Sequence, residues 1–168
     1  MNRIKNVFAD YAAVKAEVLS TNFTAYNGMY LAKTPKATAE ELLLAVNKHG
    51  EFEQIESVIR TNDQWRDTQF RIHTDSEIQG QQPSHAVIAY FTTDINTGTA
   101  FYSSLTHGDS SKTPKVFIED DGTWQTYTKM SAKDNTAVLF GADLFHMRYP
   151  RICVVPRYVI VSFLKEVI

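Results

Sequence analysis

A series of short, strand-like segments that begins after about residue 68 is the feature that most constrains the fold. At least six of these segments are rich in β-branched and aromatic residues, and turn signals separate them. They cover residues 69–75, 86–92, 99–103, 115–118, 124–128, 136–140 and 157–164. Two of them, 86–92 and 157–164, are the most apolar, so we expect them at the centre of a sheet. Asp121-Gly122 is a two-residue hairpin signal between 115–118 and 124–128.

The first third of the chain carries helical signals instead. Apolar residues recur at helical spacing over about 6–19, which predicts an amphipathic helix there. Thr38 and Glu41 have the spacing of a capping box and predict the start of a second helix, with Gly50 as its stop signal. A third, shorter helix is expected over 53–60.

Helices followed by many short strands predict a mainly β protein of the α+β class, a sandwich or jelly roll packed on amino-terminal helices. We expect a single domain over residues 1–168, with helical support over about 1–67 and a β core over about 68–168. The two most apolar strands would be covered on one face by the helices.

Composition and charge narrow the class of protein. With 168 residues the chain is long enough for one domain with a proper core and short for two. A formal net charge of −2, without a basic run, argues against a nucleic-acid partner. We expect no membrane span and no signal peptide, because no long apolar run occurs. The single cysteine, Cys153, allows neither an intrachain disulfide nor a thiolate cluster, which favours a cytoplasmic, reducing compartment.

His73 and Asp75 are two residues apart in the segment 69–75, so both side chains point to the same face of a strand. His146 would reach the same place if the sheet folds over. Two imidazoles and one carboxylate are the ligand set that suits Fe(II), with three positions left for substrate and oxygen. Spacing alone also allows a simpler interpretation, in which these residues form the solvated face of a half-exposed strand.

Five segments in order carry a family resemblance. They are Arg-Ile-His-Thr-Asp at 71–75, Ile-Ala-Tyr-Phe at 88–91, Gly-Thr-Ala-Phe at 98–101, Phe-Gly-Ala-Asp-Leu-Phe-His at 140–146 and Arg-Tyr-Val-Ile-Val-Ser-Phe at 157–163. Together they resemble the 2-oxoglutarate oxygenase superfamily, in the style of its prolyl-hydroxylase-like branch, over roughly residues 69–165. This resemblance implies a double-stranded β-helix, the cupin-like form of the jelly roll.

The resemblance also implies roles for five residues. His73, Asp75 and His146 match the family's iron ligands. Arg157 matches the basic residue that pairs with the distal carboxylate of 2-oxoglutarate, a task that suits the planar fork of a guanidinium. Tyr90 matches a tyrosine that hydrogen-bonds the same carboxylate in some relatives.

Two departures from the family pattern leave questions open. The family usually shows Gly-Gly-Thr before the phenylalanine, whereas this chain has Thr97-Gly98-Thr99. The interval from His146 to Arg157 is eleven residues, one or two longer than is common, which leaves Arg151 as a competing anchor for the carboxylate. Arg151 follows a proline in the expected turn, so we favour Arg157.

The implied activity is that of an Fe(II)- and 2-oxoglutarate-dependent dioxygenase. Such an enzyme hydroxylates an unactivated C–H bond with O2 as cosubstrate and releases succinate and CO2, with ascorbate as a candidate reductant. The prime substrate would be a peptide or small molecule, with a slight lean to an amino-acid or peptidyl side chain. The walls of the substrate site would come from residues 76–84, 104–112 and 147–155. An exposed sheet edge or an amino-terminal helix would allow a homodimer.

Two rival interpretations stay open. A cupin-like metalloenzyme that does not use 2-oxoglutarate would need the two histidines and Asp75 but not Arg157. A non-catalytic jelly-roll binding module would need none of them, and its histidine–aspartate pair would carry no metal.

Overall fold

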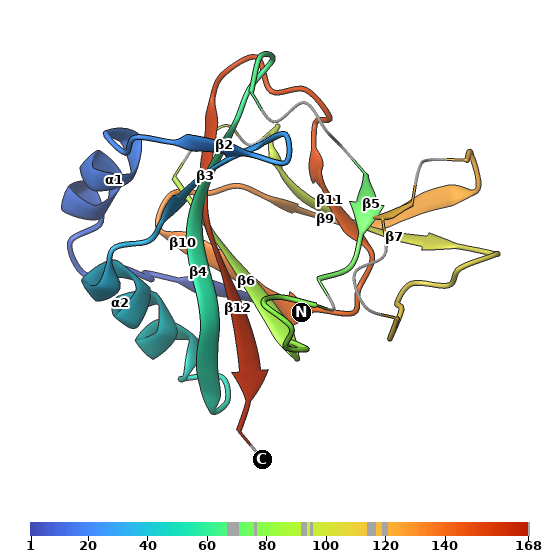
Figure 1. Cartoon of the computed structure of the whole chain (residues 1–168), viewed down its shortest axis with the longest axis horizontal. Coiled ribbons are helices and arrows are strands. Elements are labelled where there is room, and N and C mark those ends of the chain that lie inside the picture. Colours follow the sequence, from blue (N-terminus) through green and yellow to red (C-terminus); the bar gives the residue numbers. More distant parts are fainter. Residues whose placement is uncertain are drawn as a thin grey trace.

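Two antiparallel sheets lie face to face, and two helices cover the outer side of the larger one (Figure 1). The computed structural model describes residues 1–66, 71–75, 77–91, 94, 96–113, 117–118 and 121–167. Parts of several predicted segments fall outside these ranges, namely 69–70, 76, 92 and 115–116. Every strand pairing among the described residues is antiparallel.

The larger sheet contains the two most apolar strands at its centre, as the sequence predicts. Its seven described strands follow the order β1 (Asn2–Lys5), β10 (Thr136–Gly141), β6 (His85–Tyr90), β12 (Arg157–Glu166), β4 (Phe52–Asn62), β3 (Met29–Lys33) and β2 (Thr24–Tyr26). β12 pairs with β6 on one side and with β4 on the other. The expected central position of 86–92 and 157–164 is therefore confirmed for the described part of these segments.

The smaller sheet corrects the predicted hairpin. Its five described strands follow the order β8 (Phe117–Ile118), β5 (Ile72–His73), β11 (His146–Tyr149), β7 (Gly98–Ser104) and β9 (Trp124–Ser131). Asp121 does form a turn, because its carboxylate accepts a hydrogen bond from the backbone N–H of Thr123 at 2.9 Å. However, β8 and β9 lie at opposite edges of the sheet and do not pair. The turn thus sends the chain from one edge to the other.

The two helices lie on one side of the larger sheet (Figure 1). They are α1 (Tyr11–Leu19) and α2 (Lys36–Val46). α1 begins later than expected because Asp10 caps it, and the Asp10 side chain accepts a hydrogen bond from the N–H of Ala13 at 3.1 Å. Among the described residues, neither helix is long and apolar enough to cross a membrane.

The expected capping box is wrong. α2 starts directly after Pro35, and no side chain caps it. The Thr38 hydroxyl donates instead to the carboxylate of Glu17 at 2.8 Å, and the Glu41 carboxylate accepts from the N–H of Ala9 at 2.6 Å. Both residues therefore tie α2 to α1 and to the turn before α1. The fixed φ of Pro35 suits the start of a helix without help from a side chain.

The helix expected over 53–60 is also wrong, since these residues form the middle of β4. Charged residues in the segment favour a helix locally, whereas Ile55, Val58 and Ile59 are β-branched and favour a strand. β4 pairs with β12 along its length and with β3 over part of it. This tertiary pairing outweighs the local preference. β1, β2 and β3 likewise come from the region in which the sequence predicts only helices, and β11 was not predicted at all.

Three clusters of buried apolar side chains hold the layers together. The first lies between the helices and the larger sheet, the second between the sheets, and the third on the outer side of the smaller sheet. Along β12, Ile160 and Leu164 belong to the first cluster, whereas Val159 and Phe163 belong to the second. Because side chains alternate along a strand, Arg157 shares the face of Val159 and points between the sheets.

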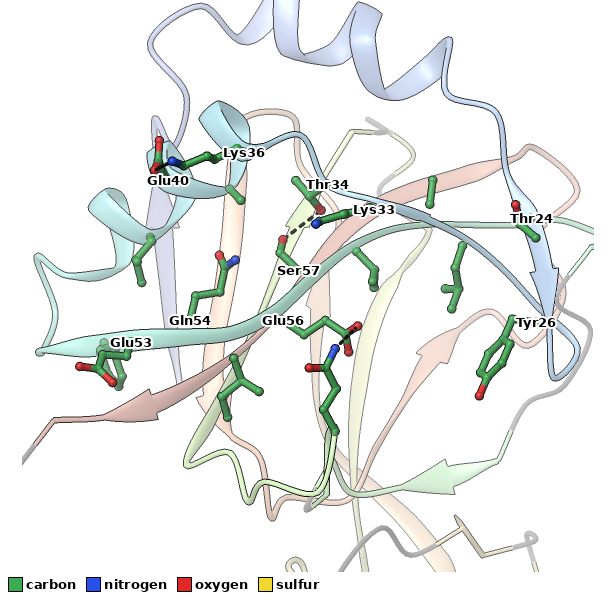
Figure 2. Close-up of a pocket in the computed structure, with 18 residues that line it drawn as sticks. Thr24, Tyr26, Lys33, Thr34, Lys36, Glu40, Glu53, Gln54, Glu56 and Ser57 are labelled. Atoms are coloured by element: carbon green, nitrogen blue, oxygen red, sulfur yellow. Dashed lines mark hydrogen bonds and ion pairs between the residues drawn. The ribbon is translucent and has the colours of Figure 1, made fainter.

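A groove of about 1050 Å³ follows the β2 edge of the larger sheet (Figure 2). Residues of β2, β3, β4 and α2 line it, together with Gln79 from the turn before β6. Glu56 accepts a hydrogen bond from the side chain of Gln79 at 2.8 Å, which joins that turn to β4. The groove therefore lies between α2 and the edge of the larger sheet that β2 and β3 form.

Gly98, the first residue of β7, allows an unusually close approach of β7 to β9. Its φ is 159°, and a Cβ on it would lie 2.1 Å from the carbonyl oxygen of Met130. We therefore expect Gly98→Ala to destabilise the protein by about 3 kcal/mol or more, because backbone must shift. Gly122→Ala is the matched control, since its φ is 82° and nothing lies within 4 Å, and it should cost about 1 kcal/mol. Urea unfolding measures both, and equal losses would contradict this account.

Candidate metal centre

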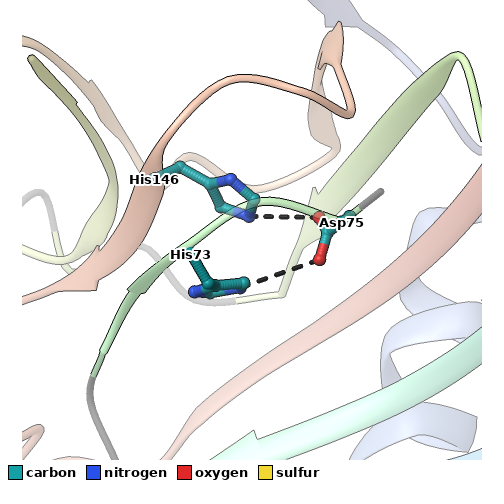
Figure 3. Close-up of side chains that lie close together, drawn as sticks. All are labelled: His73, Asp75 and His146. Atoms are coloured by element: carbon teal, nitrogen blue, oxygen red, sulfur yellow. Dashed lines mark ion pairs between the residues drawn. The ribbon is translucent and has the colours of Figure 1, made fainter. Parts of the chain in front are cut away.

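His73, Asp75 and His146 converge on one point of the smaller sheet (Figure 3). β5 and β11 are neighbours, and His73 lies directly opposite His146 in their register. Asp75 follows β5, and its backbone N–H donates to the carbonyl oxygen of Ala142 at 2.8 Å. The two-residue spacing thus keeps His73 near Asp75, while strand pairing brings His146 from a distant part of the sequence.

The distances between the donor atoms suit a small cation. One carboxylate oxygen of Asp75 lies 3.2 Å from Nε2 of His146, and the other lies 3.7 Å from Nε2 of His73. All three donor atoms lie within 4.8 Å of one another. Ligands held at right angles about 2.1 Å from one metal are about 3 Å apart. A small inward movement would therefore place these three on one face of an octahedron.

Hydrogen bonds to the backbone orient both imidazole rings. Nδ1 of His73 lies 2.8 Å from the carbonyl oxygen of Arg71, and Nδ1 of His146 lies 2.9 Å from that of Leu144. Since a carbonyl oxygen only accepts, each Nδ1 carries the hydrogen and donates it. In the neutral ring Nε2 then presents a lone pair toward the carboxylate of Asp75, whereas in the protonated ring Nε2 carries a hydrogen and faces the carboxylate as a donor. A bound cation stabilises such convergent lone pairs.

The electrostatic surroundings favour the protonation states that metal ligation requires. Burial, together with the charge of His146, lowers the pKa of His73 to about 4, so His73 is neutral near pH 7. Burial on its own would raise the pKa of Asp75. The charge of His146 and its hydrogen bond to Asp75 outweigh burial, and the pKa of Asp75 is lowered. A neutral imidazole and an ionised carboxylate are both ready to ligate.

Aromatic rings support the centre on one side. The ring of Phe140 meets the ring of His146 edge to face, with centroids 4.8 Å apart, and Phe101 lies 6.1 Å from the same ring. Phe101 and Phe140 pack on each other at 5.0 Å, and both are buried. His146 itself is 4% exposed. These contacts hold the imidazole in place and keep water from that side of it.

Arg157 is buried between the two sheets. It is 4% exposed, and its guanidinium donates to the side-chain oxygen of Asn62 and to the carbonyl oxygen of Gly98, each at 3.4 Å. Both acceptors are neutral, and both distances are long for an N–H···O hydrogen bond. The guanidinium therefore links β4 of the larger sheet with β7 of the smaller one. Hydrogen bonds from the guanidinium to a carboxylate would be stronger than these two.

Tyr90 lies beside Arg157 in the interior. Its ring centroid lies 5.7 Å from the guanidinium carbon of Arg157, and its hydroxyl lies 2.8 Å from that of Thr99. Tyr90 is fully buried. Burial raises its pKa, against the charge of Arg157 and the hydrogen bond with Thr99. The phenol is therefore neutral near pH 7 and can donate a hydrogen bond.

β7 connects Tyr90 to the metal centre. Thr99 and Phe101 are two residues apart on β7, so they share a face, about 7 Å from each other. Thr99 contacts Tyr90, whereas Phe101 contacts His146. Neighbouring residues of β7 thus contact both Tyr90 and His146.

Arg151, the competing anchor of the sequence analysis, lies elsewhere. It is exposed, and its backbone carbonyl accepts a hydrogen bond from Nε of Arg148 at 3.2 Å. Sequence reasoning missed Asn62, which contacts Arg157, and Thr99, which contacts Tyr90. Asn62 follows a segment that was predicted to be helical, so its face could not be derived. Thr99 lies in the Gly-Thr-x-Phe segment of the family resemblance, and that segment could have identified Thr99 as a site residue.

No protein-family model matches the sequence, and no curated protein matches it. Solved structures match the fold. The non-heme α-ketoglutarate-dependent epimerase SnoN from nogalamycin biosynthesis has a TM-score of 0.60 at 8% identity, over 98% of this chain and 77% of that one. HygX from Streptomyces hygroscopicus, with nickel and 2-oxoglutarate bound, has a TM-score of 0.60 at 13% identity, over 98% and 82%. The viral collagen prolyl hydroxylase vCPH from Paramecium Bursaria Chlorella virus-1, in its 2-oxoglutarate complex, has a TM-score of 0.54 at 11% identity, over 99% and 96%.

Identities this low show the fold and not the reaction. The neighbours include an epimerase, a carbocyclase and a prolyl hydroxylase, and some of them hold iron or nickel, or 2-oxoglutarate. The expectation of a jelly roll backed by helices is confirmed. The chain has the double-stranded β-helix fold of the iron- and 2-oxoglutarate-dependent enzymes.

Proposed function

We propose that this protein is an Fe(II)- and 2-oxoglutarate-dependent dioxygenase. The observation that carries the proposal is the convergence of three lone-pair donors, from His73, Asp75 and His146, with both imidazoles oriented by backbone carbonyls. Two imidazoles and one carboxylate on one octahedral face suit Fe(II) and leave three positions open. When bound, the iron would supply the activation of O2 that no side chain can perform.

Arg157 and Tyr90 would bind the distal carboxylate of 2-oxoglutarate. The Arg157 guanidinium can offer two parallel N–H donors, and the neutral Tyr90 hydroxyl can offer a third donor. Asn62 and Gly98 hold the guanidinium in position from two different strands. Because Thr99 and Phe101 of β7 contact Tyr90 and His146 respectively, the other end of the cosubstrate would extend toward the metal.

The reaction we favour is hydroxylation of an unactivated C–H bond, with release of succinate and CO2. Neighbours of this fold include an epimerase and a carbocyclase, so the outcome depends on how the prime substrate is held. The protein's part is to orient that substrate beside the metal and to exclude water. A peptide or small-molecule substrate, a cytoplasmic location and a homodimer remain proposals.

Metal binding gives the first prediction. Addition of Ni(II) or Mn(II) at about 100 times its Kd should stabilise the protein by about 2.7 kcal/mol and raise its Tm by about 5–10 °C. Asp75→Ala and His146→Ala should lose this shift because each removes a ligand. His49→Ala is the control, since His49 is exposed and lies outside the three-residue centre. If wild type shows no shift, the binding-module interpretation is favoured.

Cosubstrate binding gives the second prediction. Under anaerobic conditions with Fe(II), 2-oxoglutarate should produce a weak visible charge-transfer band that titrates with its binding. Arg157→Gln should weaken this binding about 10- to 100-fold, because hydrogen bonds to a charged group contribute about 1.5–3 kcal/mol. Arg151→Gln should leave it unchanged. Nickel-induced stabilisation of Arg157→Gln verifies that this variant folds, and a metal-loaded wild type without the band would favour the cupin-like alternative.

Tyr90→Phe gives a third, graded prediction. The change removes one hydroxyl, and with it the hydrogen bond to Thr99 and the donor to the cosubstrate. We expect 2-oxoglutarate to bind about fivefold more weakly, as for the loss of one hydrogen bond of about 1 kcal/mol. The same anaerobic titration measures it. An unchanged affinity would assign Tyr90 to the core alone.

A further inference from the structure

A second guanidinium, that of Arg3, reaches the interior from β1, at one edge of the larger sheet. Arg3 lies directly opposite Val138 of β10 in register, and Val138 belongs to the apolar cluster between the sheets. The next residue of β1, Ile4, belongs instead to the cluster beneath the helices. Because side chains alternate along a strand, Arg3 points between the sheets, where it is half-buried.

The contacts of Arg3 join the two sheets. Its guanidinium donates to the hydroxyl of Thr136 on β10 at 3.4 Å, and it lies 4.0 Å from the sulfur of Met130 on β9. Both partners are neutral, and both contacts are long for hydrogen bonds. Asp134, two residues before Thr136, is paired with Lys15 at 2.9 Å. Within the described part of the chain, no carboxylate forms an ion pair with Arg3.

The same contacts place Arg3 beside Tyr90. Thr136 lies directly opposite Tyr90 in the register of β10 and β6, and Met130 lies directly opposite Thr99 in the register of β9 and β7. Opposite residues of antiparallel strands have Cβ atoms about 4.5–5.5 Å apart. Tyr90 and Thr99 also join the sheets, since their hydroxyls are 2.8 Å apart. The bridge that Arg3 forms therefore runs next to the bridge of Tyr90 and Thr99.

Tyr90 thus lies between two guanidiniums. The strand order β1, β10, β6, β12 puts Arg3 on one side of Tyr90 and Arg157 on the other, and the guanidinium carbon of Arg157 is 5.7 Å from the centroid of the Tyr90 ring. Burial raises the pKa of Tyr90 and that of Tyr149, while the positive charges of both arginines act in the opposite direction on each phenol. Both charges therefore act on the same part of the interior, in agreement with the register.

An anion beside Tyr90 is favoured by these two charges. The anion proposed for this place is the distal carboxylate of 2-oxoglutarate, bound by Arg157 and Tyr90. Coulomb attraction extends beyond hydrogen-bond distance, and it is weakened less in a desolvated interior than in water. Arg3 can therefore stabilise the carboxylate without touching it. A 2-oxo acid that ends in an uncharged group would gain nothing from this charge.

We propose that Arg3 is a specificity-determining residue, whose charge favours a 2-oxo acid with a distal carboxylate over one without it. Arg157 binds that carboxylate directly, and Arg3 adds to the attraction from the other side of Tyr90. This inference rests on the proposed function, because it concerns the cosubstrate of the same site. β1 then completes the cosubstrate site, although it lies outside the five segments of the family resemblance.

Two compounds with the same carbon chain test the proposal. 2-Oxopentanoate has a methyl group where 2-oxoglutarate has its distal carboxylate, so the ratio of the two dissociation constants measures what that carboxylate contributes. We would load the full chain with Fe(II) under anaerobic conditions and titrate the visible charge-transfer band with each compound. Two neutral replacements, Arg3→Gln and Arg3→Met, should each weaken the binding of 2-oxoglutarate about 5- to 20-fold and leave that of 2-oxopentanoate within about twofold. Arg3→Lys should lose less, because it keeps the charge.

Lys5→Gln is the matched control, since it removes one positive charge from the same strand at an exposed position. It should leave both dissociation constants within about twofold, and stabilisation by Ni(II) verifies that each variant folds. The proposal is overturned if the neutral replacements leave the ratio unchanged or weaken both compounds equally, because Arg3 would then only hold β1 against β9. It is also overturned if Arg3→Lys loses as much as Arg3→Gln. Absence of metal or 2-oxoglutarate binding in wild type is a separate result, which contradicts the proposed function itself.

Discussion

The pairing of β12 with β4 on one side and β6 on the other determines which side chains face the interior. Arg157, Tyr90 and Asn62 come from these three strands, and the shared register turns all three toward the smaller sheet. A slip of one residue would exchange them for side chains of the apolar cluster under the helices. The apolar residues that lock the register thus also orient the polar residues of the site.

The interior therefore holds polar groups in an apolar setting, and backbone groups orient several of them. Backbone carbonyl oxygens accept hydrogen bonds from Nδ1 of His73 and of His146. The carbonyl oxygen of Gly98 accepts one from the guanidinium of Arg157. Such bonds compensate the burial of these polar groups, and they leave Nε2 of both histidines directed at Asp75. Little rearrangement is then needed when a charged ligand enters, because the donors and acceptors already have their orientation.

Much of this arrangement could be predicted from the sequence, because it depends on local pattern. His73 lies in β5 and Asp75 two residues later, directly after that strand, and the alternation along 157–164 correctly places Arg157 on the inner face. The failure to predict β4 has a physical cause. The segment 53–60 has charged residues that favour a helix, and only pairing with β12 and β3 makes it a strand. With that strand unrecognised, the inward direction of Asn62 could not be read.

The proposed metal ligands and the proposed carboxylate anchor come from different sheets, and this division has a mechanical consequence. His73 and His146 are part of the smaller sheet, whereas Arg157 starts the central strand of the larger one. A dicarboxylate bound at both ends would span the space between the two sheets. Because apolar packing fixes the distance between the two sheets, that distance would determine which length of dicarboxylate fits. Discrimination against shorter or longer diacids would then depend on how the two sheets pack, and not on any single side chain.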